Sequence, residues 1–356
     1  MAGKNLWLLC NGDKSMFRVS VVTPVYNAEK YLRRAVEAAL GQEETDEVIL
    51  VEDDSPDGSL DLCRQIEAEF DRVRLVRHPD GRNHGCGASR NLGVESARND
   101  IIAFADADNF YLENRFKRDK EILSTDQTID GVYNAQGIHY YSEKAKKIFF
   151  ESGLGDGAFL SLSEPVPPEE LLSVFFGKHA TASVLGGIGI DALTLRRRAF
   201  DMAGMFKPEL KQMQDVNIYV RLAATCRLAA GELKKPVAVR GVHEQMRSTN
   251  AQAQRRYRKD CWDDLYVWFK NAALPKSTWQ AFEAYHLRQS IPGLPKWAAR
   301  RRFLWYVLRH PAVLSEANGL FDFSLFDAFG RNWATLHLTS VKNKLISKFR
   351  RRQTTC

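Results

Sequence analysis

The chain has 356 residues, of which 44% are hydrophobic and 27% are charged, as is typical of a soluble protein with one large domain or two. Six scattered cysteines without a CxxC pair argue against a disulfide scaffold and a zinc site, and no apolar run reaches the roughly 18 residues that span a bilayer. The first residues show no clear signal-peptide cleavage site, so we expect a cytoplasmic protein.

The first part of the chain alternates apolar, strand-like runs with helical patterns. Strands that are apolar throughout and separated by helices indicate a parallel sheet with helices on both faces. We therefore expect an α/β domain with a mixed, mostly parallel sheet. In chain order the runs are FRVSVVTPVY, AEKYLRRAVEAAL, EVILVED, SLDLCRQIEAEF, VRLVRH, GASRNLGVESA and IIAFADAD, between residues 17 and 110.

The pattern changes after this region. Residues 131–150 suggest a hairpin, residues 152–170 form a Gly/Ser/Pro-rich connection, and a helix fits residues 214–225. Beyond about residue 250 the chain reads as aromatic-rich basic helices. We predict three parts: an N-terminal tail (1–16), the α/β domain (17–245) and a helical basic region (246–356).

The formal net charge of +7 comes from the end of the chain. Residues 331–356 hold seven Lys and Arg and no acid, so the charges of the rest of the chain balance. Leu338, Val341, Leu345 and Phe349 follow a helical spacing within it. This pattern predicts a basic amphipathic helix over residues 338–352, which would either rest on the anionic inner face of a membrane or pack on the protein itself.

Acidic side chains follow the apolar runs where ligands collect in parallel sheets. Glu52, Asp53 and Asp54 close one run, and Asp106 and Asp108 close another. Carboxylates converging on one rim would repel each other unless a cation lies among them, and Mg²⁺ or Mn²⁺ needs one or two of them plus substrate phosphates. For an isolated Asp-x-Asp, a turn in which both side chains cap backbone amides is the alternative.

Five segments stand out in chain order: VSVVTPVYNAEKYLRRAV, VEDDSPDGS, GCGASRNLGVESA, IIAFADADN and GMFKPELKQMQDVNIYVRLA. Together they resemble the family 2 inverting glycosyltransferases of GT-A fold, and the resemblance covers about residues 17–245. It implies transfer of a sugar from a nucleoside-diphosphate donor, such as a UDP-sugar, to a saccharide or lipid-linked saccharide acceptor. Such a reaction would serve polysaccharide or glycoconjugate synthesis, and it implies no nucleic-acid partner.

The resemblance also implies roles for single residues. Asp53 would bind the base or ribose, Asp106 would face the ribose, and Asp108 would hold the divalent metal, with His243 as a possible further ligand. Arg90 would lie near the diphosphate. The alternative for Arg90 is a surface helix arginine, and the alternative for His243 is a structural residue without a metal. The nucleotide-sugar site would further include Thr23, Pro24, Tyr26 and Glu29.

Asp215 matches the position that serves this family as general base. Such a base takes the proton of the acceptor hydroxyl while the metal stabilises the leaving diphosphate. The alternative for Asp215 is a first-turn acid of the predicted helix. The chain departs from the family at Glu52, at Asp54 and at Gln214, where Glu usually precedes the base.

Two other functions remain open from the sequence. A nucleotidyltransferase or sugar pyrophosphorylase would use similar metal-diphosphate chemistry, but PVYNAEK lacks the glycine-rich phosphate loop that it needs. A catalytically inactive nucleotide-sugar-binding domain would fit Gln214, whereas Asp53, Asp108 and Asp215 favour activity.

Overall fold

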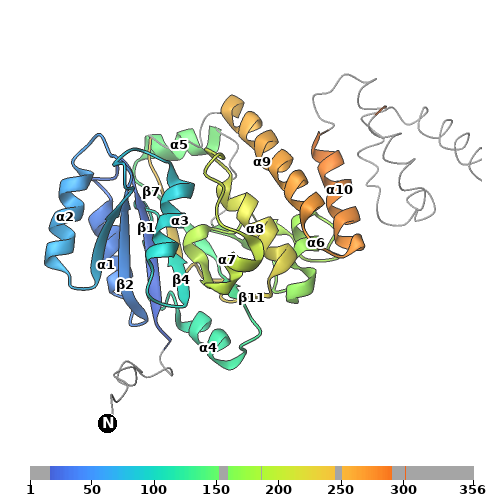
Figure 1. The fold of residues 1–356 in the computed structure, drawn as a ribbon, viewed down its shortest axis with the longest axis horizontal. Helices are drawn as coiled ribbons and strands as arrows, with labels where there is room; N and C mark the ends of the chain where they lie inside the picture. Colours follow the sequence, from blue (N-terminus) through green and yellow to red (C-terminus); the bar gives the residue numbers. More distant parts are fainter. Residues whose placement is uncertain (1–16, 152–158, 186, 245–250, 291–300, 302–356) are drawn as a thin grey trace, which may run out of the picture. The chain divides into compact units, whose positions relative to one another are not determined.

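A computed structural model describes most of the chain (Figure 1). The described residues are 17–151, 159–185, 187–244, 251–290 and 301. The chain divides into two compact units, residues 1–274 and 275–356. Both sheets lie in the first unit, and helix α10 (Lys276–Ser290) lies in the second. The functional boundary expected between residues 245 and 246 stays a prediction.

The main sheet has seven strands in the order β11-β6-β10-β4-β1-β2-β3. All its pairs are parallel except the two that β10 makes with β4 and β6. The mixed, mostly parallel sheet expected from the sequence is therefore confirmed. Its strands are β1 (Val19–Val25), β2 (Thr45–Glu52), β3 (Val73–Arg77), β4 (Ile101–Phe104), β6 (Gly131–Tyr133), β10 (Leu193–Arg196) and β11 (Leu228–Ala230).

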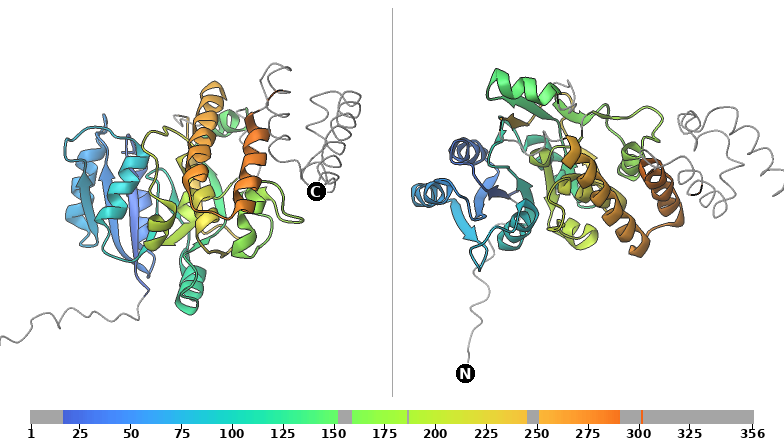
Figure 2. Two further views of the ribbon diagram at one scale, coloured as in Figure 1. Left: turned by 45° about the vertical axis from the view of Figure 1, so that its right-hand side comes forward. Right: turned by 90° about the horizontal axis from the view of Figure 1, so that it is seen from above.

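Helices cover both faces of this sheet (Figure 2). Strand β1 is buried along its whole length, and its successive side chains enter different cores: Val21 packs with residues of α1 and α2, and Val22 packs with residues of α3 and α8. These helices are α1 (Leu32–Leu40), α2 (Ser59–Glu69), α3 (Cys86–Ser96) and α8 (Gln214–Thr225). Burial on both faces explains why the strands read as continuous apolar runs.

A second sheet has the strand order β5-β12-β7-β8-β9. The hairpin expected over residues 131–150 is wrong, because β6 belongs to the main sheet and β7 pairs in parallel with β12 of the second. The backbone of Ala135 bonds to Glu232 and Val237 instead of closing a turn. The strands are β5 (Phe110–Tyr111), β7 (Gln136–Tyr140), β8 (Phe159–Leu162), β9 (Val184–Leu185) and β12 (Ala238–Val242).

Short helices and one long helix complete the first unit. They are α4 (Lys117–Thr125), α5 (Glu143–Glu151), α6 (Leu171–Phe175), α7 (Arg198–Ala203) and α9 (Ala251–Asn271), with two 3₁₀ turns at Pro168–Glu170 and Ile190–Ala192. The amide of Asn217 on α8 donates to Asp264 on α9 at 2.9 Å, which ties these two helices together. The helix expected over residues 214–225 is confirmed as α8.

Two expectations concern membranes. None of the helices within the described ranges is both long and apolar enough to cross a bilayer. The basic amphipathic helix expected over residues 338–352 lies outside the described residues.

Candidate active site

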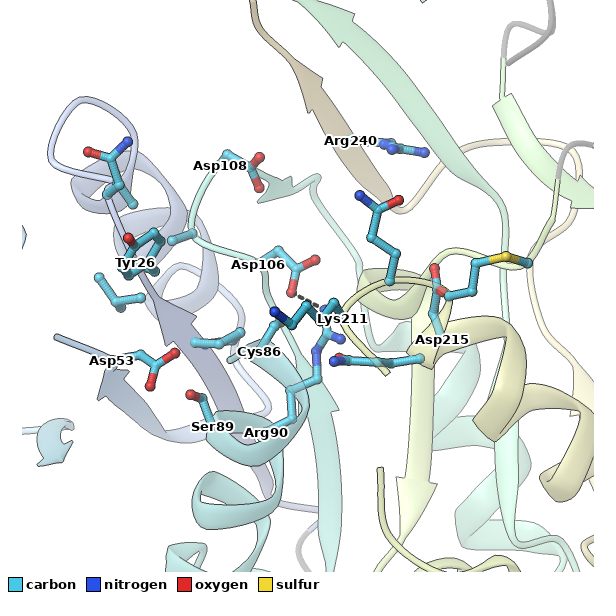
Figure 3. Close-up of a pocket in the computed structure, with 18 of the residues that line it drawn as sticks. Tyr26, Asp53, Cys86, Ser89, Arg90, Asp106, Asp108, Lys211, Asp215 and Arg240 are labelled. Atoms are coloured by element: carbon cyan, nitrogen blue, oxygen red, sulfur yellow. Dashed lines mark hydrogen bonds and ion pairs between the residues drawn. The ribbon is translucent and has the colours of Figure 1, made fainter. Parts of the chain in front are cut away.

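A pocket of about 690 Å³ opens where the main sheet meets α8 and β12. Figure 3 shows Tyr26, Asp53 and Ser89 on one side of it and Asp215 on the other, with Asp106 and Asp108 between them. The lining residues that enter the argument are Pro24, Tyr26, Tyr31, Asp53, Arg90, Asp106, Asp108, Lys211, Gln214, Asp215, Arg240, His243 and Arg258. Residues far apart in the sequence thus meet at the carboxyl ends of β1, β2 and β4, as parallel-sheet topology requires.

Asp53 is held rigidly at the end of β2. Its two carboxylate oxygens accept the backbone N–H groups of His84 at 2.7 Å and Gly85 at 2.8 Å. Gly85 has a φ of 86°, a conformation that suits glycine and lets the loop turn back onto the carboxylate before α3 begins. Asp53 therefore faces the pocket in a fixed orientation, and each oxygen keeps a further lone pair.

Asp106, the first carboxylate of the Asp-x-Asp, pairs with Arg90 of α3. The distance from the Arg90 Nη2 to Asp106 Oδ1 is 2.6 Å, and only 5% of Arg90 is exposed. Burial lowers the pKa of Arg90, but the neighbouring anionic groups, Asp106 foremost among them, together raise this pKa above its ordinary value. Arg90 is thus no surface helix arginine: it is a buried cation that fixes Asp106.

Asp108, the second carboxylate, pairs with His243 from the end of β12. His243 Nε2 lies 3.1 Å from Asp108 Oδ2, and the imidazole stacks on the ring of Tyr31 with centroids 4.9 Å apart. His243 Nδ1 is buried, and no partner for it exists among the described residues. Strand β12 and helix α1 together orient this pair.

Asp108 offers the carboxylate oxygen that a hard divalent cation prefers, and the His243 imidazole lies beside it. In the part of the chain that the structure describes, no three His, Cys, Asp or Glu side chains come together as a closed protein cage. Mg²⁺ does not need such a cage, because it binds through one or two carboxylates and completes its shell with water and substrate phosphates. Asp108 would supply the oxygen ligand and His243 the nitrogen ligand.

A buried carboxylate, Asp191, holds the backbone of the Asp-x-Asp segment in place through hydrogen bonds. Its oxygens accept the backbone N–H of Asp106 and the side-chain amides of Asn109 and Gln136, each at 2.6 Å. Burial raises the pKa of Asp191 to about 7, and the charge of Asp106 adds to this effect. The position of the Asp-x-Asp backbone thus depends on a residue 85 positions later in the chain.

The raised pKa of Asp191 gives a prediction for stability. A carboxyl group with a raised folded-state pKa stabilises the protein at low pH, and this contribution is lost as the pH rises from about 4 through about 7. Asp191→Asn lacks this titrating group. The free energy of unfolding of the wild type, taken relative to that of the variant, should therefore fall by at least about 1.4 kcal/mol between about pH 4 and about pH 7. Urea unfolding at several pH values measures this difference, and a constant difference would contradict the prediction.

Asp215 occupies the first turn of α8. The helix begins after Met213, which adopts a left-handed conformation with a φ of 60°, and Asp215 Oδ1 accepts the backbone N–H of Val216 at 2.9 Å. Gln214 lines the pocket and is buried: its amide donates to the carbonyl of Leu210, and its side chain packs 3.0 Å from the position that a Cβ on Gly87 would take. Gln214 thus has a packing role beside the carboxylate.

Several acidic or polar residues expected at the site lie elsewhere. Glu52 bonds to Arg77 at 2.8 Å and to the backbone of Ser55, so it does not crowd the rim. Neither Glu52 nor Asp54 lines the pocket. Thr23 is buried within β1, and the Glu29 carboxylate accepts the backbone N–H of Gly58, so the pocket lining does not support their expected nucleotide contacts.

The sequence gives no clear signal for five residues that line the pocket or support its lining. Tyr31 belongs to a helical pattern, Asp191 stands in an ordinary loop sequence, and three basic residues lie outside any motif. Only the quoted segment GMFKPELKQMQD could have drawn attention to one of them, Lys211. The basic residues are Lys211, Arg240 and Arg258.

Residues 20–155 match the family model described as glycosyl transferase family 2. This part of the chain is therefore similar in sequence to family 2 glycosyltransferases. Its curated relatives include an uncharacterized glycosyltransferase of Haemophilus influenzae, 37% identical over 101 residues that cover 28% of this chain and 40% of the relative. The putative teichuronic acid biosynthesis glycosyltransferase TuaG of Bacillus subtilis is 33% identical over 106 residues, covering 30% of this chain and 41% of TuaG. The matched segment thus spans less than half of these relatives.

Solved structures show the same fold. The chain superposes on S. aureus TarS 1–349 in complex with UDP-GlcNAc with a TM-score of 0.56 and 16% identity, over 85% of this chain and 76% of TarS 1–349. A mannosyltransferase of Pyrobaculum calidifontis in complex with GDP-Man and Mn²⁺ gives a TM-score of 0.50 and 17% identity, over 89% of this chain and 80% of the other. The expected GT-A fold is therefore confirmed.

Proposed function

We propose that this protein is an inverting, metal-dependent glycosyltransferase that moves a sugar from a UDP-sugar to a hydroxyl group of a saccharide or lipid-linked saccharide. The observation that carries this proposal is the arrangement of the pocket. A fixed Asp53 lies at one side, the Asp215 carboxylate lies at the other side, and Asp108, which pairs with His243, lies between them (Figure 3). A nucleoside, a diphosphate and an acceptor hydroxyl need these three environments in this order.

The nucleoside would lie beside Pro24, Tyr26 and Asp53. Tyr26 is 41% exposed and offers a ring face to a base, while Asp53 offers acceptor lone pairs to an imide N–H or a hydroxyl. Asp106, which Arg90 holds in place, would face the ribose. The guanidinium of Arg90 would add positive charge next to the diphosphate.

The central pair would bind Mg²⁺ or Mn²⁺ through Asp108 and His243. The bound cation would stabilise the negative charge of the diphosphate as it leaves. The complex of the Pyrobaculum mannosyltransferase with GDP-Man and Mn²⁺ supports this proposal by the likeness of the fold.

Asp215 would act as the general base. It takes the proton of the acceptor hydroxyl, whose oxygen forms a bond to the anomeric carbon on the face opposite the diphosphate. The bond from the anomeric carbon to the diphosphate oxygen breaks, and its electron pair leaves with the diphosphate. Because attack and departure occur on opposite faces, the configuration at the anomeric carbon inverts.

The wider role that we propose is the synthesis of a cell-surface polysaccharide or glycoconjugate. Relatives named for teichuronic acid and minor teichoic acid biosynthesis in Bacillus subtilis support it. We further propose that the protein works at the inner face of the membrane, through the basic segment that ends the chain.

A thermal-shift panel of nucleotide sugars tests the donor proposal. A ligand that binds only the folded state raises the apparent stability, so a UDP-sugar with Mn²⁺ or Mg²⁺ should raise the melting temperature, and the same sugar with EDTA should raise it less. At a ligand concentration 100 times the dissociation constant the stabilisation is about 2.7 kcal/mol. The absence of a shift with every nucleotide sugar would contradict the proposal.

A further inference from the structure

Three aromatic side chains from different elements contact one another beside the Asp108 carboxylate. Tyr31 directly precedes α1, Tyr141 follows β7, and His243 follows β12. The ring centroid of Tyr31 lies 4.9 Å from that of the His243 imidazole, with 26° between the ring planes, and 4.6 Å from that of Tyr141. Tyr31 and His243 both line the pocket. Tyr31 is therefore the ring that connects His243 to the end of β7.

The His243 imidazole has a hydrogen-bond partner on one side only. Its Nε2 lies 3.1 Å from Asp108 Oδ2, whereas its Nδ1 is buried and has no hydrogen-bond partner among the described residues. A histidine that binds a metal usually donates its other ring N–H to a carboxylate, a backbone carbonyl or a water, and this bond fixes the orientation of the ring. Because no protein group within the described ranges gives His243 such a bond, the packing around the ring has to set its plane.

The ring of Tyr31 provides that packing. The small angle between the two ring planes places the imidazole against the face of the phenol ring, and rotation of the imidazole about its Cβ–Cγ bond would break this contact. The backbone of Tyr31 is fixed as well: its N–H donates to the carbonyl of Ala28 at 2.9 Å, and its carbonyl accepts the N–H of Ala35 at 3.3 Å. Tyr31 thus offers His243 a surface that is itself held at the start of α1.

Tyr141, the third ring, holds the other member of the pair. Its hydroxyl donates to the backbone carbonyl oxygen of Asp108 at 3.2 Å. Gly241 of β12 lies against the same oxygen, and a Cβ at this position would overlap both the oxygen and the Tyr141 ring. The lack of a side chain at Gly241 therefore lets β12 bring His243 up to Asp108.

We propose that Tyr31 is a positioning residue for the metal site: its ring face holds the His243 imidazole in the plane in which Nε2 faces a cation at Asp108. This inference rests on the proposed function and adds a residue that acts through His243. The ring takes the place of the hydrogen bond that usually orients a metal-binding histidine. The hydroxyl of Tyr31 has no part in this role.

Two other roles for Tyr31 predict different results. If the ring only filled space, its loss would lower the melting temperature without a loss of metal affinity that requires His243. If the ring contacted the nucleotide, its loss would weaken the binding of UDP in EDTA as much as in Mn²⁺. The proposed role predicts a loss of Mn²⁺ affinity that depends on His243, with the binding of UDP in EDTA unchanged.

The test measures the Mn²⁺ affinity of the full chain in saturating UDP, from the electron paramagnetic resonance signal of free Mn²⁺. Loss of a residue that supports a metal ligand typically costs about 10- to 100-fold in metal affinity, so Tyr31→Leu should lose about tenfold or more. Tyr31→Phe keeps the ring and should bind Mn²⁺ as the wild type does. Tyr31→Met fills the space with a flexible chain and should behave as Tyr31→Leu does, so it takes over the test if the leucine variant does not fold.

A double-mutant cycle with His243→Ala shows whether Tyr31 acts through the imidazole. Tyr31→Leu should cost about tenfold or more on its own and nothing further in the His243→Ala background. The matched control is Tyr140→Leu, which should bind Mn²⁺ and UDP as the wild type does. Tyr140 is a half-buried residue of β7 that packs on Phe149 and Phe150 and does not line the pocket.

Four results would overturn the inference: an unchanged Mn²⁺ affinity in Tyr31→Leu, an equal loss in Tyr31→Phe, the same loss in the His243→Ala background, or an equal loss of UDP affinity in EDTA. The last result would assign Tyr31 to the nucleotide. A wild type that binds no Mn²⁺ with UDP, or a His243→Ala variant that binds it as tightly as the wild type, would count against the proposed metal site and remove the inference with it. The two kinds of failure are therefore distinguishable.

Discussion

Asp215→Asn should reduce sugar transfer, or the slow hydrolysis of the donor in the absence of an acceptor, by about 10² to 10⁴. Asn is nearly isosteric with Asp and can accept the N–H of Val216 as Asp215 does, so the start of α8 should keep its structure. It cannot take a proton, so the loss should appear in kcat while the affinity for UDP stays the same. Release of UDP from the donor, followed over time, measures the rate.

A matched control is Asp201→Asn. Asp201 is an exposed acid in the first turn of α7 and does not line the pocket, so this variant makes the same chemical change in the first turn of another helix. It should turn over at the wild-type rate. If Asp215→Asn were equally active, Asp215 would be only a helix-terminal acid and the base would have to be sought elsewhere.

Asp108→Ala should nearly abolish the binding of UDP that depends on a divalent cation. The substitution removes the oxygen ligand of the proposed metal site and leaves the His243 imidazole alone. Loss of a residue that supports a metal ligand typically costs about 10- to 100-fold in metal affinity, so loss of the ligand itself should cost at least about 100-fold. Calorimetric titration of UDP in the presence of Mn²⁺ measures the effect.

Asp54→Asn is the control for charge. Asp54 follows β2, is exposed and does not line the pocket, and Asn tolerates its left-handed φ of 58°. Both variants remove one negative charge, but only Asp108→Ala should weaken UDP binding. Equal affinity for UDP in excess EDTA and in Mn²⁺, in the wild type, would show that the metal role is wrong.

The sheet and α8 could be predicted because their signals are local. Strands β1, β2 and β4 are buried on both faces and therefore read as continuous apolar runs, each followed by polar residues. The pocket gathers Asp53, Asp106, Asp108, Asp215 and His243, all named from motifs, although their roles stay proposals.

The remaining features depend on contacts between distant segments. The support of Asp106 by Asp191 and the stacking of Tyr31 on His243 leave no periodic or motif signal in the sequence. The misread hairpin has the same origin, since β7 pairs with β12, a strand about 100 residues later. Glu52 shows the opposite case. Its place in a motif predicted a position at the rim of the sheet, but its carboxylate pairs with Arg77 instead.

The most direct measurement of the central claim is the release of UDP from a UDP-sugar that stabilises the wild-type protein in the thermal-shift panel. We expect release in Mn²⁺ that stops when EDTA is added and falls by at least about 10² in Asp215→Asn, while that variant still binds UDP. Binding of UDP-sugars by the wild type without any release of UDP, with or without a range of saccharide acceptors, would contradict the account and leave a nucleotide-sugar-binding domain.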